Sequence, residues 1–268
     1  METILTALIL LGATGLVVGL FIGVASIFFK TEKNEKKEAI LKMLPGNNCG
    51  GCGYPGCEGL AQAISEGKAP CDACPVGGAP VAQEIGAYLG ETVDASVRKV
   101  AFVQCGGDEK KAEVDYEYVG LRDCKMAGVL PGGGAKTCNY GCLGLGSCVK
   151  ACKFDAIHIE NGIAVADPKK CTGCGQCVKA CPKHLITLIP YNAPVMVLCS
   201  SCDKGPDVMK SCKIGCIGCG ICKKTCQHDA ITIDQFCATI DPKKCVGCGE
   251  CVEKCPRKVI VFRDQKSR

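Results

Sequence analysis

Two runs of four cysteines share one spacing and could hold the same inorganic cofactor. They contain Cys171, Cys174, Cys177 and Cys181 in CTGCGQCVKACP, and Cys245, Cys248, Cys251 and Cys255 in CVGCGECVEKCP. This spacing is typical of thiolate ligands of [4Fe–4S] clusters, in which three cysteines of a loop bind one cluster and the fourth binds a neighbouring cluster. Zinc sites rarely place four thiols so close together in the chain. The runs therefore indicate one-electron transfer.

The two runs belong to an internal repeat. Residues 138–189 and 212–263 match as two copies with an offset of 74 residues. Each copy is predicted to contain a cysteine loop, a short helix, an alternating apolar hairpin (Ile157–Val165 or Ile231–Ile240) and a second cysteine loop. Such a hairpin alone would be marginally stable, so bound clusters would act as its core. Each copy is thus expected to be a bacterial-ferredoxin-like unit with two [4Fe–4S] clusters.

Crossed ligation in both units predicts four cluster sites. In the first unit the ligand sets are Cys138, Cys142 and Cys148 with Cys181, and Cys171, Cys174 and Cys177 with Cys152. In the second unit they are Cys216, Cys219 and Cys222 with Cys255, and Cys245, Cys248 and Cys251 with Cys226. Leu145 stands where the second unit has Cys219, so Cys138 is expected to substitute in the first unit. Its repeat partner Cys212 could then compete with Cys219.

A third motif precedes the repeats and predicts a fifth cluster. Cys49, Cys52 and Cys57 are followed by a helix-like run and then by Cys71 and Cys74. Glycines between the first three cysteines let backbone N–H groups approach cluster sulfurs, which influences the reduction potential. The predicted ligands are Cys49, Cys52, Cys57 and Cys74, with Cys71 as the alternative to Cys74.

The composition agrees with a fold that is stabilised by clusters. The chain of 268 residues has 27 cysteines and 34 glycines but no tryptophan and only 5% aromatic residues. An odd number of cysteines in these spacings argues against a disulfide framework, and free thiols indicate a reducing compartment. The formal charge is +5, but the basic residues are scattered and lack interleaved aromatics, so no nucleic-acid partner is expected.

The N-terminal segment is uncharged from Ile4 to Phe29. Twenty-six such residues exceed the roughly 20 that a helix needs to span a bilayer, so residues 1–29 are predicted to be a transmembrane anchor. The start Met1-Glu2-Thr3 lacks the basic residues of a cleaved signal peptide. Lysines follow the segment and none precedes it, which places the rest of the chain on the cytoplasmic side.

The resulting fold class is a small, cluster-stabilised α+β protein with a transmembrane helix, one [4Fe–4S] domain and two tandem ferredoxin-like units. Short β-rich runs lead into each unit, one ending at Cys105 and the other at Cys199 and Cys202. The predicted divisions are an anchor at 1–29, an N-terminal cluster domain with a charged helical connector at 30–92, a strand with the first unit at 93–190, and a strand with the second unit at 191–268.

Seven cysteines fall outside the predicted ligand sets: Cys71, Cys105, Cys124, Cys199, Cys202, Cys212 and Cys237. Buried, inert thiols are one interpretation, and it is the one preferred for Cys237. The alternative is a sixth site formed by Cys105, Cys124, Cys199 and Cys202. No nucleophile–base pair, dinucleotide fingerprint or flavin motif is present, so no catalytic site beyond electron transfer is expected.

The order of these features resembles the RnfB family, the iron–sulfur B subunit of the Rnf ion-translocating electron-transport complex. The resemblance covers essentially the whole chain. It is carried by the predicted anchor, by CGGCGYPGC with its distal cysteine, and by the ferredoxin repeats. It implies an oxidoreductase subunit that transfers electrons from soluble ferredoxin towards a partner that reduces NAD, coupled to Na⁺ or H⁺ translocation by membrane subunits. The alternative is an electron-feeding or activator subunit of a corrinoid or other reductase enzyme.

Overall fold

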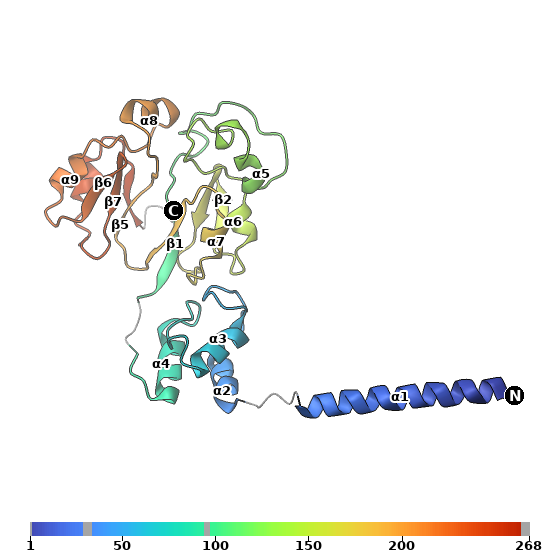
Figure 1. The fold of residues 1–268 in the computed structure, drawn as a ribbon. Coiled ribbons are helices and arrows are strands. Elements are labelled where there is room, and N and C mark those ends of the chain that lie inside the picture. Colours follow the sequence, from blue (N-terminus) through green and yellow to red (C-terminus); the bar gives the residue numbers. More distant parts are fainter. Residues whose placement is uncertain (1, 29–33, 94–96, 264–268) are drawn as a thin grey trace.

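The computed structural model describes residues 2–28, 34–93 and 97–263. A single helix, α1 (Glu2–Phe28), comes first and is followed by a helical N-terminal domain (Figure 1). Two ferredoxin-like units then lie side by side at the end of the molecule remote from α1 (Figure 1). The predicted ferredoxin-like part of the fold is therefore confirmed.

Helix α1 stands apart from the other elements (Figure 1). Its described large apolar side chains, among them Leu10, Leu16 and Phe21, are exposed. Among the described residues, however, no helix combines the length and the apolar character needed to cross a membrane. The transmembrane anchor predicted over residues 1–29 is therefore not supported by the structure. Residues 1 and 29 of that prediction lie outside the described residues.

The N-terminal domain packs three helices, α2 (Glu35–Met43), α3 (Cys57–Ser65) and α4 (Gly78–Leu89). Asn34 caps α2 by accepting a hydrogen bond from the backbone N–H of Lys37 at 3.2 Å. Ile40, Leu60 and Ile85 are completely buried among these helices. The predicted charged connector thus forms most of α2, which packs onto this domain through Ile40. Residues 30–33 lie outside the described residues.

Both ferredoxin-like units are built from the same elements in the same order. The first contains β1 (Lys99–Val103), α6 (Ser147–Lys150), β2 (Ile157–Glu160), β3 (Ile163–Ala166), α7 (Gln176–Ala180) and β4 (Ile186–Pro190). The second contains β5 (Val195–Val197), α9 (Ile221–Thr225), β6 (Ile231–Asp234), β7 (Cys237–Ile240), α10 (Glu250–Lys254) and β8 (Ile260–Phe262). The predicted hairpins are β2–β3 and β6–β7, and each leading strand pairs antiparallel with the last strand of its unit.

Small aliphatic cores and cysteine loops hold each unit together. Ile157 and its repeat partner Ile231 are buried on the hairpins, among cysteines of both loops. The loop before α7 ends at Gly175 and the loop before α10 ends at Gly249, with φ angles of 74° and 83°. This left-handed conformation favours glycine, and it turns the chain from the loop into the helix that carries the last cysteines.

The two units are joined next to the cysteines that follow their leading strands. The backbone N–H of Gly106 donates to the carbonyl of Leu198 at 3.0 Å. The guanidinium groups of Arg98 and Arg263 each lie over the ring of Tyr191, 4.7 Å from its centroid. The segments that lead into the cysteine loops carry α5 (Cys124–Gly128) and the 3-10 turn η1 (Pro131–Gly133) in the first unit, and α8 (Gly205–Ser211) in the second.

Candidate iron–sulfur sites

In the second unit, each predicted ligand set lines a cavity of its own. Cys216, Cys219, Cys222 and Cys255 line a cavity of about 340 Å³. Cys226, Cys245, Cys248 and Cys251 line another of about 350 Å³. Burial, followed by the charges of Cys216, Cys255 and Cys219, raises the pKa of Cys222 to about 11. Iron binding would therefore have to displace protons from closely spaced thiols, as expected for a cluster site.

The first unit brings together the second of its predicted ligand sets. Burial and then the charges of Cys171, Cys174 and Cys152 raise the pKa of Cys177 to about 12. Backbone N–H groups approach these sulfurs, from Ala101 to Cys171 at 3.2 Å and from Ala156 to Cys152 at 3.4 Å. Such N–H donors favour electron-rich sulfur and are among the protein's controls on cluster potential.

The other set of the first unit differs from the sequence prediction. Burial, followed by the charges of Cys142, Cys124 and Cys181, raises the pKa of Cys148 to about 12. Cys138 is absent from these neighbours and interacts instead with Cys105, Cys199 and Cys212. The structure thus brings Cys124, the first residue of α5, close to Cys148.

Helix α5 is held in this position by short polar contacts. Asp123 caps it and accepts from the backbone N–H of Lys125 at 2.8 Å. The backbone N–H of Cys124 donates to the hydroxyl of Ser147, at the start of α6, at 2.7 Å. Sequence reasoning left Cys124 among the spare cysteines. Two sequence features could have pointed to Cys124. The loop of the first unit has Leu145 where a ligand cysteine is expected, and an unusually long segment that contains Cys124 precedes this loop.

In the N-terminal domain, the structure separates the two candidates for the fourth ligand. Burial raises the pKa of Cys74, and the charges of Cys57 and Cys52 raise it further. The backbone N–H of Gly77 donates to Cys74 Sγ at 3.3 Å. Cys71 instead donates to Glu91 Oε2 at 3.2 Å, and burial with this bond raises its pKa to about 11. Of the two, Cys74 lies with the motif cysteines.

The N-terminal motif contacts the first unit directly. Gln176 Nε2 donates to the carbonyl of Cys49 at 2.5 Å, and Lys153 Nζ donates to that of Asn48 at 3.2 Å. A side chain at Gly51 would collide with the backbone of Cys174, so only glycine allows the two loops to come this close. The N-terminal site and one site of the first unit are therefore neighbours.

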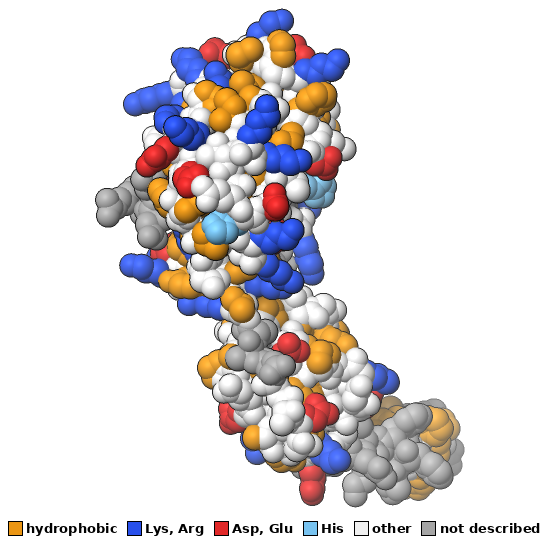
Figure 2. All heavy atoms as spheres, turned by 90° about the vertical axis from the view of Figure 1, so that its left-hand side faces the viewer, with side chains coloured by type: hydrophobic (Ala, Val, Ile, Leu, Met, Phe, Trp, Pro, Cys, Tyr) orange, Lys and Arg blue, Asp and Glu red, His pale blue; other side chains and the backbone are white. Residues whose placement is uncertain are grey.

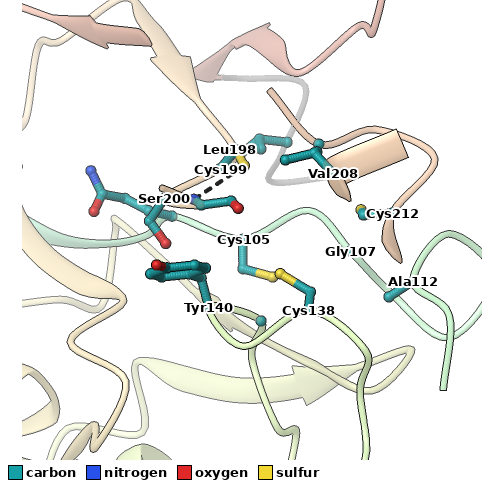
Figure 3. Close-up of a pocket in the computed structure, with 14 residues that line it drawn as sticks. Cys105, Gly107, Ala112, Cys138, Tyr140, Leu198, Cys199, Ser200, Val208 and Cys212 are labelled. Atoms are coloured by element: carbon teal, nitrogen blue, oxygen red, sulfur yellow. Dashed lines mark hydrogen bonds between the residues drawn. The ribbon is translucent and has the colours of Figure 1, made fainter. Parts of the chain in front are cut away.

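Cys138 lines a further cavity with Cys105, Cys199 and Cys212 (Figure 3). Cys202 is not among these lining residues, and its thiol approaches Gln235 Oε1 at 3.1 Å. Cys237 is buried, as expected, and its thiol donates to the carbonyl of Cys199 at 3.3 Å. The four cysteines predicted for a sixth site are therefore not brought together as one set.

The donor sets fit iron–sulfur clusters. All 27 cysteines lie within the described residues and are free thiols. Across the described ranges, no three His, Cys, Asp or Glu side chains converge closely enough to hold a single metal ion. A cubane binds each thiolate at a different iron, so its ligands surround a space instead of meeting at a point. The cavities lined by four cysteines have this arrangement.

Comparisons with known proteins identify the same parts of the chain. Family models match at residues 44–76 ("Putative Fe-S cluster"), 164–187 ("4Fe-4S binding domain") and 215–261 ("4Fe-4S dicluster domain"). The B subunit of the ion-translocating oxidoreductase complex of Methanosarcina acetivorans is 44% identical over 98% of this chain and 99% of its own length. The chain belongs to this family. The predicted resemblance is confirmed, as is the presence of [4Fe–4S] cofactors.

Two bacterial relatives of the family have more specific names. The B subunit of the Na⁺-translocating ferredoxin:NAD⁺ oxidoreductase complex of Acetobacterium woodii is 45% identical over 91% of this chain and 73% of its own length. The B subunit of the proton-translocating ferredoxin:NAD⁺ oxidoreductase complex of Clostridium ljungdahlii is 40% identical over 80% of this chain and 76% of its own length. None of these names supports the alternative of an activator subunit for a corrinoid enzyme.

Proposed function

We propose that this chain is the multi-cluster electron-transfer subunit of an ion-translocating complex that carries electrons between ferredoxin and NAD. The observation that carries the proposal is the 44% identity with a relative of this family over nearly the whole of both chains. The cysteine sets described above supply the sites that this role requires. Clusters bound there would exchange single electrons, while the chain sets their potentials through burial and N–H donors to sulfur.

The proposed ligands form five sets. They are Cys49, Cys52, Cys57 and Cys74; Cys124, Cys142, Cys148 and Cys181; Cys152, Cys171, Cys174 and Cys177; Cys216, Cys219, Cys222 and Cys255; and Cys226, Cys245, Cys248 and Cys251. Cys124 replaces Cys138 relative to the sequence prediction, on the strength of its contact with Cys148. Divisions near residues 29, 92 and 190 separate an N-terminal helix, one cluster domain and two units.

Electrons are proposed to enter at the second unit. Cys219 and Cys248 are its exposed ligands, whereas Cys174 of the first unit is covered by the N-terminal motif. Exposed lysines flank other cysteines of the same loops: Lys223 and Lys224 follow Cys222, and Lys243 and Lys244 precede Cys245. Figure 2 shows Lys and Arg side chains spread over this part of the surface. A soluble ferredoxin, usually acidic, would be attracted to such a surface and would reach clusters close to solvent.

The direct test is reduction of the full-length, cluster-loaded chain by a reduced bacterial ferredoxin, followed anaerobically by stopped-flow absorbance. We expect rapid reduction at low salt and a rate that falls as ionic strength rises, because exposed charges are screened. Failure of ferredoxin to reduce the chain, under conditions where dithionite reduces it, would contradict the proposed donor.

We also propose that the N-terminal segment attaches the chain to the membrane, with the cluster domains on the cytoplasmic side. The support is the uncharged run from Ile4 to Phe29, the lysines that follow it, and the exposed apolar side chains of α1. Carbonate extraction of membranes from the native host should leave the chain in the pellet. A variant that starts at residue 31 should be released, and its retention would argue for attachment through partner subunits alone.

A further inference from the structure

Four cysteines surround the cavity between the units. Each unit contributes two of them, at matching positions. Cys105 follows β1 and Cys199 follows β5, while Cys138 and Cys212 come from matching positions at the start of the two repeats. Figure 3 shows Cys105 and Cys138 with their sulfurs directed towards each other, and Cys199 and Cys212 on the side of the second unit. The hydrogen bond from Gly106 to Leu198 holds the two halves of this site together.

The cavity has the same kind of lining as the two cysteine-lined cavities of the second unit. All three are lined by four cysteines, although the sequence motifs predict only the last two. Cys105, Cys138, Cys199 and Cys212 are buried or half-buried, and all four are free thiols.

Backbone donors approach the four sulfurs in matched pairs. The N–H of Cys142 donates to Cys105 Sγ at 3.4 Å, and the N–H of its repeat partner Cys216 donates in the same way to Cys199. Likewise, the N–H groups of Tyr140 and Ile214, two residues beyond Cys138 and Cys212, donate to the sulfurs of those cysteines. Both halves of the site therefore present donors to sulfur in the way that cluster sites do.

Two further features suit a bound anionic group. A Cβ atom at Gly107 would lie 3.3 Å from Cys212 Sγ and 3.9 Å from Cys105 Sγ, so glycine leaves this space free. Lys136 is buried beside the site and donates from Nζ to the carbonyl of Gly107 at 2.7 Å. Ala112 forms an antiparallel β-bridge with Cys212, which holds the segment that follows Gly107 against the second unit.

We propose that Cys105, Cys138, Cys199 and Cys212 bind a sixth [4Fe–4S] cluster at the interface between the two units. The binding of the cluster stands on the geometry alone. Its role rests on the proposed function: a site shared by both units would accept one electron from the second unit and pass one to the first, with no bond made or broken. The six sites would then form one line from the second unit to the N-terminal domain, instead of two branches.

Iron and acid-labile sulfide in the full-length chain, purified without oxygen, test the binding. We expect about 24 iron atoms in the unmodified chain and about 20 in Cys105→Ala and in Cys199→Ala, since one cubane holds four. The double variant should also retain about 20, because both cysteines belong to one cluster. Cys237→Ala is the matched control and should keep all the iron, since Cys237 is buried beside Cys199 but does not line the cavity.

Three outcomes would overturn the proposal: unchanged iron in the single variants, a loss of about eight iron atoms in the double variant, or zinc in place of the missing iron. The EPR signals of the remaining reduced clusters should persist in each variant and so show that the units still fold. If iron is lost together with all other cluster signals, the cysteines are structural and the proposal is also wrong.

The role as a bridge is tested by ferredoxin reduction of Cys199→Ala. We expect clusters of the second unit to be reduced at the rate of the unmodified chain, and those of the first unit and N-terminal domain at least tenfold more slowly. Equal rates for all clusters would overturn the bridge. If ferredoxin reduces neither chain, the proposed donor fails, while the iron count still decides whether the sixth cluster exists.

Discussion

The two ferredoxin-like units complete their first cysteine loops in different ways. The second unit has three cysteines within its loop, whereas the first has Leu145 at the position of Cys219. Cys105 and Cys138 are 33 positions apart, but the matching Cys199 and Cys212 are only 13 apart. The longer segment of the first unit contains α5, which places Cys124 beside Cys148. The longer segment therefore brings a cysteine close to the loop that lacks one, and we propose it as the replacement ligand.

The two units also differ in the exposure of their sites. In the second unit, Cys219 and Cys248 reach the surface. In the first unit, Cys124 is buried and Cys174 is covered by the N-terminal motif. Two copies of one fold have thus been adapted to different neighbours. One leaves two of its loop cysteines exposed, and the other contacts both the second unit and the N-terminal domain.

The largest expected effect tests the inserted ligand. Cys124→Ala should remove one cluster from the first unit, which lowers the iron content by about four atoms per chain. Adding Leu145→Cys to this variant should restore the iron, because it recreates the loop of the second unit. Iron analysis and EPR of the reduced chains would measure both effects. Full iron in Cys124→Ala would contradict the proposed difference and return the ligand role to Cys138. Cys71→Ala is a suitable control, since Cys71 is bonded to Glu91.

A second prediction concerns the surface of the two units. Lys243→Glu with Lys244→Glu should slow reduction by ferredoxin on the order of tenfold at low ionic strength, because steering by opposite charge is lost. The difference should fade as salt is added. The matched change in the first unit, Lys169→Glu with Lys170→Glu, should have little effect. Equal slowing by both pairs would show that the donor does not distinguish the units.

A smaller effect is expected from the buried lysine of the first unit. Lys136→Met removes a positive charge close to Cys142 and to the cavity between the units. The nearby reduction potentials should fall by tens of millivolts, on the scale of the 59 mV that changes a one-electron equilibrium tenfold. EPR-monitored redox titration would measure the shift. Lys210→Met changes the matched position of the second unit, where the side chain is exposed, and should leave the potentials unchanged.

The smallest effect is expected at Cys237, whose match in the first unit is Ile163. The thiol of Cys237 also lies within hydrogen-bond reach of the sulfur of Cys216, and this interaction lowers the pKa of Cys216 to about 6 and raises the pKa of Cys237. Cys237→Ile should retain all the iron but lower the potential at the Cys216 site slightly, because one donor to sulfur is lost. Redox titration with Ile163→Val as the control would show this. Loss of iron in Cys237→Ile, without loss of fold, would make Cys237 a ligand.

Several features of the fold and sites could be predicted from local sequence alone. The cysteine loops could be recognised because ligands a few residues apart must meet whenever the loop closes around a cluster. The hairpins followed from alternation, and Ile157 and Ile231 are buried on them as expected. The helical character of the connector was right, but its burial through Ile40 depended on α3 and α4, which contribute the other side of that core.

The meeting of distant cysteines, in contrast, could be seen only in the folded chain. Cys124 joins Cys148 because Asp123 and Ser147 fix α5 against the loop, and no spacing rule connects those positions. The four cysteines of the cavity between the units come together because the units pack through the segments that follow β1 and β5. The kind of cofactor and the repeated unit were already defined in the sequence, since both depend on short-range spacing. The sharing of ligands between segments depends on long-range packing, which a linear pattern does not contain.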